Sequence, residues 1–117
     1  MEKIESQNVL ARLPGHSQAD EILMVSSHWD AYGQGEPDSL GRTVRPGAND
    51  DALGTAGVIE LARVLKAGEP MARSVVFAAW TAEEAGLLGS AAYAAKPIYP
   101  LHSTVANFTL DILQTAG

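Results

Sequence analysis

Two apolar runs of strand length limit the folds open to this chain. They are EILMVSS at residues 21–27 and SVVFAAW at residues 74–80. Both are continuous rather than alternating, which is typical of strands buried on both faces of a sheet. A strand of this kind needs helices packed above and below it. The two runs therefore predict an α/β domain.

The segments around these runs predict the order of the elements. The expected elements are strands at 8–13 and 21–27, a helix at 50–66, a strand at 74–80, a helix at 83–95 and a strand at 104–113. A turn at Pro14-Gly15 and a polar tip at residues 17–20 suggest that the first two strands form a hairpin. The order β-β-α-β-α-β favours a mixed, mostly parallel sheet with flanking helices.

Residues 31–49 are rich in glycine and proline and predict a loop without regular structure. A loop of this length in a compact domain is usually functional or disordered. The whole chain has 117 residues, of which 46% are hydrophobic, so it is one domain's worth and can bury a single core.

Charge and composition exclude several classes of protein. The formal net charge of −6 argues against a nucleic-acid partner, which needs a basic face. No apolar run approaches the roughly 18 residues that a membrane span requires. Cysteine is absent, which excludes disulfides and thiolate metal sites. No basic-then-apolar leader opens the sequence, but a secreted or periplasmic parent with a cleaved leader would look the same.

Six side chains suited to chemistry fall near the carboxyl ends of the expected strands, where α/β sheets bind ligands. They are His28, Asp30, Asp50, Glu83, Glu84 and Asp111. Taken singly, most have ordinary explanations: a satisfied histidine at a strand end, a helix N-cap, or an acidic first turn. Together, carboxylates and imidazole without sulfur suit zinc, manganese or related divalent ions. In a Glu-Glu pair, one carboxylate can bind metal while the other serves as a base.

Four segments carry a resemblance to a known family: SHWDAYG, PGANDDALGTAGVIELARVL, SVVFAAWTAEEAGLLGS and VANFTLD. In this order and at these spacings, they resemble the zinc metallopeptidase family of the bacterial leucine-type aminopeptidases and glutamate carboxypeptidases. Its members are co-catalytic di-zinc exopeptidases. The resemblance covers residues 8–113 but only the amino-terminal part of the family's catalytic domain. We therefore expect residues 1–117 to be a single, partial catalytic domain.

The resemblance implies a metal centre with two zinc ions. His28 and Asp111 would bind the first ion, and Glu84 would bind the second. Asp50 would bridge both ions and would precede a cis peptide bond to Asp51. Of the other two candidates, Glu83 would be the general base and Asp30 would orient the His28 ring.

The sequence departs from the family pattern in two places. The segment between His28 and Asp50 is longer than in the shortest members, and its added residues are expected to form a lip of the pocket. The family also takes a final zinc-binding histidine from well beyond Asp111. His16 and His102 do not match that position and are expected to be ordinary exposed residues. One zinc site is thus better formed than the other, and we expect weak turnover and self-association of the isolated fragment.

The resemblance implies a zinc-dependent, aminopeptidase-type exopeptidase that hydrolyses N-terminal peptide bonds of a peptide substrate. Two alternatives stay open at this point. A glutaminyl-cyclase-like transferase shares the fold and needs a single zinc, for which Asp50 and Glu84 are available. A non-catalytic binding module on the same fold is the other alternative, since fold alone does not fix function.

Overall fold

A four-stranded sheet forms the middle layer of the computed structural model, which describes residues 3–113. Its strands are β1 (Val9–Leu13), β2 (Gln18–His28), β5 (Arg73–Trp80) and β6 (Thr104–Thr109), in the spatial order β1-β5-β2-β6. Strand β2 runs parallel to both β5 and β6, whereas β1 is antiparallel to β5. The predicted mixed, mostly parallel sheet is confirmed.

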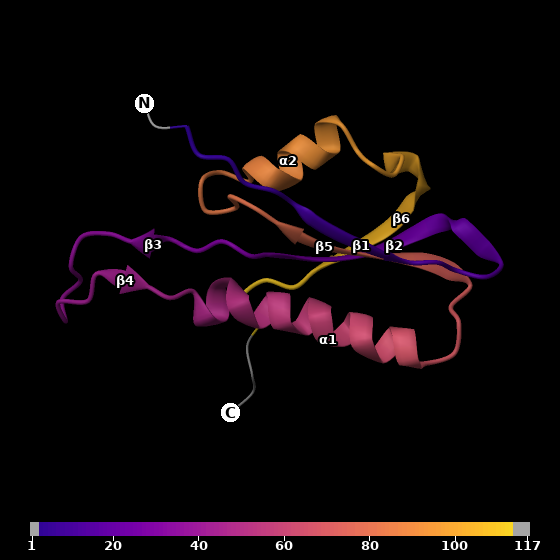
Figure 1. Ribbon diagram of the computed structural model, residues 1–117, viewed down its shortest axis with the longest axis horizontal. Coiled ribbons are helices and arrows are strands. Elements are labelled where there is room, and N and C mark those ends of the chain that lie inside the picture. The colour runs from indigo at the N-terminus through magenta and orange to yellow at the C-terminus, as the bar shows by residue number, and fades with distance from the viewer. Residues whose placement is uncertain (1–2, 114–117) are drawn as a thin grey trace.

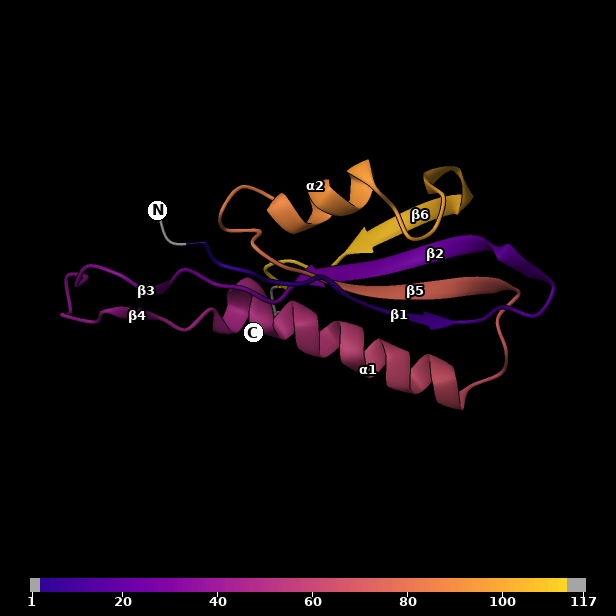
Figure 2. The same ribbon diagram turned by 45° about the horizontal axis from the view of Figure 1, so that its top comes forward.

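Helices cover both faces of this sheet, as the two apolar runs predicted. Helix α1 (Leu53–Ala67) lies on one face and α2 (Leu88–Ala95) on the other (Figures 1 and 2). Successive side chains of β5 point to opposite faces of the sheet. Val75 and Phe77 pack with Val58 of α1, whereas Val76 packs with Tyr93 of α2. Each such buried side chain contributes about 1.5–3 kcal/mol. None of the helices in residues 3–113 is long and apolar enough to cross a membrane.

The expected hairpin between the first two strands is wrong, because β5 lies between β1 and β2. The turn after β1 packs on the start of β5 instead. His16 donates its backbone N–H to the carbonyl of Met71 at 3.0 Å. A Cβ atom at Gly15 would lie 2.4 Å from the carbonyl oxygen of Ala72, so this approach requires glycine.

The second helix begins later than predicted, at Leu88 instead of residue 83. Residues 81–87 form a loop, because Ala82 (φ 53°) and Leu87 (φ 61°) adopt left-handed backbone conformations that an α-helix does not allow. Each such non-glycine residue costs roughly 1–2 kcal/mol. Glu83 and Glu84 therefore lie in a loop. The last strand likewise ends at Thr109, which leaves Asp111 beyond it.

The long glycine-rich segment contains more regular structure than expected. The short strands β3 (Gly33–Gln34) and β4 (Val44–Arg45) pair as an antiparallel arm that extends away from the sheet (Figure 1). At its tip, Asp38 accepts hydrogen bonds from the backbone N–H groups of Leu40 and Arg42 and from the Arg42 guanidinium, at 2.8–2.9 Å. These bonds lower the pKa of Asp38. Two short helical turns complete the fold: η1 (Ala48–Ala52) and η2 (Leu101–Ser103).

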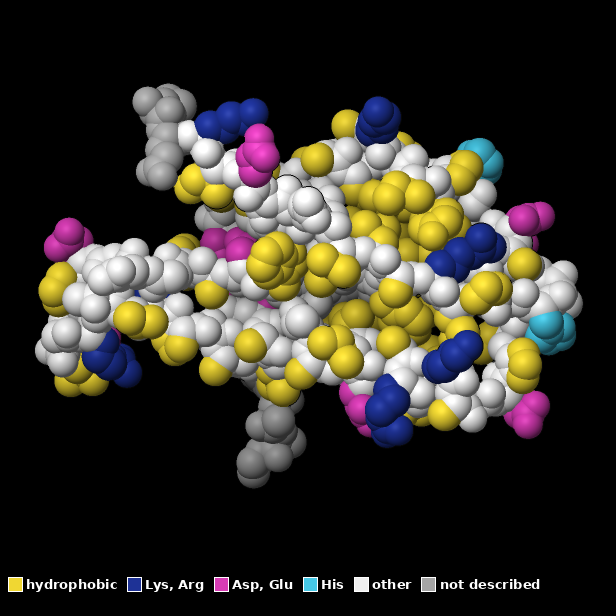
Figure 3. Space-filling view, viewed as in Figure 1, with side chains coloured by type: hydrophobic (Ala, Val, Ile, Leu, Met, Phe, Trp, Pro, Cys, Tyr) yellow, Lys and Arg dark blue, Asp and Glu magenta, His cyan; other side chains and the backbone are white. Residues whose placement is uncertain are grey.

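Apolar side chains gather where β1 runs between α1 and α2 (Figure 3). A groove of about 410 Å³ lies there between β1 and α1, and Val9, Ile59 and Phe77 are among its lining residues. Val9 and Ile59 are exposed. Self-association of the chain, for which such surface is suited, stays a prediction.

Candidate metal centre

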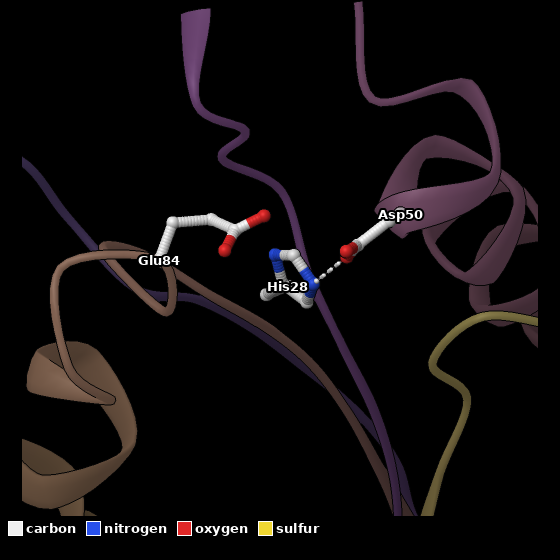
Figure 4. Close-up of side chains that lie close together, drawn as sticks. All are labelled: His28, Asp50 and Glu84. Atoms are coloured by element: carbon white, nitrogen blue, oxygen red, sulfur yellow. Dashed lines mark hydrogen bonds and ion pairs between the residues drawn. The ribbon is translucent and has the colours of Figure 1, made fainter. Parts of the chain in front are cut away.

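A buried histidine lies at the centre of the candidate site. His28 is the last residue of β2 and is 3% exposed. Asp50 from η1 and Glu84 from the loop after β5 lie beside its imidazole ring (Figure 4). One ligand atom from each of these residues lies within 4.8 Å of the other two. The His28 Nε2 atom is 2.9 Å from Asp50 Oδ1.

A second group of ligand atoms shares the same histidine. It contains His28, Asp51 and Asp111, again with ligand atoms within 4.8 Å of one another. His28 Nε2 lies 3.8 Å from Asp111 Oδ1 and 4.0 Å from Glu83 Oε2. All the predicted ligands and the predicted base thus surround one ring. The expected division of these ligands between two ions stays a prediction.

Asp51 lies near the start of α1, where the sequence suggested a capping carboxylate, and it also has a contact with β2 that was not predicted. Its side chain is 1% exposed, and it accepts the backbone N–H of His28 through Oδ2 and that of Gly54 through Oδ1, each at 3.1 Å. It therefore ties the end of β2 to the start of α1. Burial raises the pKa of Asp51, against the two hydrogen bonds. The peptide bond between Asp50 and Asp51 is cis, as the resemblance implied.

Gly54→Ala is expected to destabilise the fold by about 1–3 kcal/mol, the usual cost of overpacking. A Cβ atom at Gly54 would lie 2.2 Å from Asp51 Oδ1 and 2.4 Å from the carbonyl oxygen of Leu110, so both would have to move. Urea unfolding followed by circular dichroism measures the loss.

Gly57→Ala, one turn further along α1, is the matched control. Within 3.4 Å, its new Cβ atom would contact one atom alone. This atom is Cδ1, at the end of the Leu110 side chain, and it lies 3.2 Å away. Alanine also favours the helix by about 1 kcal/mol over glycine. Equal unfolding midpoints for the Gly54 and Gly57 variants would contradict the role given to the Asp51 contact.

Asp30 holds the loop that carries the two glutamates. Its Oδ1 accepts the backbone N–H of Glu83 at 3.0 Å, and its Oδ2 accepts that of Glu84 at 3.1 Å. Burial raises the pKa of Asp30, but these hydrogen bonds bring it below its usual value. Its carboxylate is 3.5 Å from His28 Nδ1, whereas its backbone carbonyl is 3.2 Å from that atom. The carboxylate therefore anchors the loop more closely than it contacts the ring.

The crowded carboxylates shift the protonation of the site. Burial alone would lower the pKa of His28, but the hydrogen bond to Asp50 and the charges of Asp51, Glu83 and Asp111 raise it overall. Burial raises the pKa of Glu83, and neighbouring carboxylates add to this, whereas His28 opposes it. Such a cluster is costly unless cations or hydrogen bonds compensate it.

The donor set fits a divalent cation. It consists of imidazole nitrogen and carboxylate oxygen, the ligands that zinc and related ions accept without sulfur. Glu84 Oε1 is buried and has no hydrogen-bond partner within residues 3–113, which suits a metal ligand. His16 and His102 are exposed, as expected, and belong to neither ligand group in this part of the chain.

The fold and the site together define an α/β domain with a carboxylate-rich candidate metal centre at the carboxyl ends of its strands. Peptidase family M28 matches residues 8–117, and the chain belongs to this family.

Individual relatives agree with this assignment. The chain is 36% identical over 113 residues to "Aminopeptidase YwaD" of Bacillus subtilis, covering 95% of this chain and 22% of the relative. It is 40% identical over 89 residues to a "Probable zinc metalloprotease" of Pyricularia oryzae, covering 75% of this chain and 17% of the relative. The solved structure of BSAP, a zinc aminopeptidase from B. subtilis, superimposes with a TM-score of 0.72 at 33% identity, covering 92% of this chain and 24% of BSAP. The chain thus spans less than a quarter of these proteins.

Proposed function

We propose that this chain belongs to a zinc-dependent, aminopeptidase-type exopeptidase. The observation that carries the proposal is the buried His28 ring, which shares one ligand set with Asp50 and Glu84 and lies 4.0 Å from Glu83. Membership of a peptidase family supports it, as do relatives named as aminopeptidases.

We further propose that Asp50 is shared by two zinc ions. His28 and Asp111 would complete one set of protein ligands, and Glu84 would belong to the other. The short contact between His28 and Asp50 and the unpartnered Glu84 oxygen support these three residues as ligands. The division between two ions follows the family resemblance. When bound, zinc would polarise the scissile carbonyl and lower the pKa of a water molecule.

Glu83 is the residue placed to move protons. The pKa of Glu83 is raised and so lies closer to neutral pH than that of an ordinary glutamate. A general acid and base works best when its pKa is near the pH of the reaction. In this proposal Glu83 accepts a proton from the attacking water and then delivers it to the leaving amine. A hollow of about 240 Å³ opens beside it, lined also by His28, Trp80 and Asp111, and offers room for a substrate side chain.

The test uses the whole protein that contains this chain. It is expected to release N-terminal residues from peptides with a free amine, to lose this activity with a zinc chelator and to regain it when zinc is returned. Amino-acid analysis of the products measures release. Release of ammonia from glutamine-initiated peptides, without free amino acids, would instead indicate the cyclase chemistry. No product from either substrate after zinc loading would contradict both.

A further inference from the structure

The loop that carries Glu83 and Glu84 is held both by its own hydrogen bonds and by side chains from outside it. It spans residues 81–87 between β5 and α2, and Thr81 and Gly89, the second residue of α2, mark its two ends. Two of its non-glycine residues, Ala82 and Leu87, have left-handed backbone conformations. Asp30 holds the middle of the loop through the two glutamate N–H groups. Within the loop, Gly86 and Leu87 donate their backbone N–H groups to the carbonyl of Glu83, and Leu88 donates to that of Ala82. These bonds shape the loop but do not attach it to the neighbouring strand β1.

The side chain of Asn8, just before β1, holds the two ends of the loop. Its Nδ2 donates to the carbonyl of Gly89 at 2.8 Å, and its Oδ1 accepts the N–H of Thr81 at 3.1 Å. Gly89 also donates its own N–H to the carbonyl of Thr81 at 3.0 Å. One amide thus closes both ends of the loop, and it uses both its donor and its acceptor.

This contact is so close that a residue larger than glycine does not fit at position 89. A Cβ atom at Gly89 would lie 2.4 Å from Asn8 Oδ1 and 2.3 Å from the carbonyl oxygen of Thr81. The two residues just before Asn8 are also tied to the site. The Ser6 and Thr81 hydroxyl oxygens lie 2.5 Å apart, and Trp29, between His28 and Asp30, donates its indole N–H to the carbonyl of Gln7 at 3.1 Å.

We propose that Asn8 is a positioning residue that fixes Glu83 and Glu84 against His28. It is half-buried and outside both apolar core clusters, so it acts on the loop and not on the core. Asp30 holds the middle of the loop, and Asn8 holds its two ends. The positioning itself does not depend on the proposed peptidase function; only its consequence for turnover does.

Amide hydrogen exchange of the whole protein that contains this chain tests the positioning directly. In Asn8→Ala, two hydrogen bonds are lost, and exchange in residues 81–89 is expected to rise about tenfold, while exchange in β2 and α1 changes less than about twofold. Asn8→Asp keeps the acceptor for Thr81 but cannot donate to Gly89 when ionised, so an intermediate rise is expected. Gln7→Ala is the control, because its side chain makes no hydrogen bond within residues 3–113, and no change is expected.

Two results would overturn the proposal. One is unchanged exchange in residues 81–89 of Asn8→Ala. The other is a rise spread evenly over the sheet and helices, which would show a merely structural role. If Asn8→Ala does not fold, Asn8→Asp decides by the same comparison.

The effect on turnover is measured separately in the whole protein. If the proposed function holds, Asn8→Ala is expected to lower kcat about tenfold with little change in KM, because misplaced catalytic groups slow the chemical step. If the unmodified protein shows no peptidase activity, the exchange experiment still tests the positioning role of Asn8 by itself. Unchanged kcat despite a loosened loop would contradict positioning of Glu83 for catalysis.

Discussion

Glu83→Gln is expected to lower kcat of the whole protein by about 10²–10⁴-fold, the usual contribution of a general acid and base. Glutamine has nearly the same shape but cannot take up a proton. The backbone N–H of Glu83 bonds to Asp30, and this contact does not involve the side chain that is changed. The loop and the metal ligands should therefore stay in place, with zinc content close to that of the unmodified protein.

Steady-state kinetics together with metal analysis separate this result from a general loss of structure. Glu69→Gln is the matched control, since Glu69 is exposed and follows α1, outside both ligand groups. It should leave both kcat and zinc content unchanged. Full activity in Glu83→Gln would refute the assignment of the base, and lost zinc would reassign Glu83 as a ligand.

Asp50→Asn is expected to weaken zinc binding by at least about a hundredfold. Loss of a ligand's supporting contact alone typically costs 10–100-fold in metal affinity, and here the charged ligand itself is lost. Competition with a coloured chelator measures the zinc dissociation constant. Asp20→Asn is the control, because Asp20 is exposed near the opposite end of β2 from His28. Equal affinities in the two variants would contradict the bridging role.

The pH dependence of zinc binding gives the same variant a second readout. Zinc needs neutral imidazole, so its affinity rises as pH increases through the pKa of His28. The hydrogen bond in which Asp50 accepts from the His28 ring helps to raise that pKa. Asp50→Asn removes the negative charge and should lower the pKa of His28. The rise in zinc affinity should therefore move to lower pH. An unchanged pH profile would show that Asp50 does not control the protonation of His28.

Sequence reasoning predicted the elements better than their pairing. Residues 21–27 and 74–80 could be assigned because burial on both faces leaves a continuous apolar run. The strand that pairs with β1 could not be assigned. The alternating pattern of β1 fits a hairpin with β2 as well as an edge strand beside β5. The contact that decides between them, Gly15 on Ala72, joins residues far apart in the sequence.

The residues predicted as metal ligands all lie around His28, and their role as ligands stays a prediction. The groups that hold them in place were harder to predict. His28, Asp50, Glu84 and Asp111 belong to quoted motifs with the chemistry of metal ligands. Asp51 and Asn8 act through backbone N–H and carbonyl groups, which leave little trace in side-chain patterns. One available signal was Gly54, three residues after Asp51, because a carboxylate that accepts an N–H three residues later is a common helix start.

The order β1-β5-β2-β6 distributes the site unevenly between the interior and the rim of the sheet. His28 ends β2 and the two glutamates follow β5, and both strands have a neighbour on each side. Asp111 follows β6, which pairs with β2 alone among the described strands. Within residues 3–113, His28 is therefore held by strand pairing on both sides of β2, whereas the position of Asp111 depends on the pairing of β6 with β2.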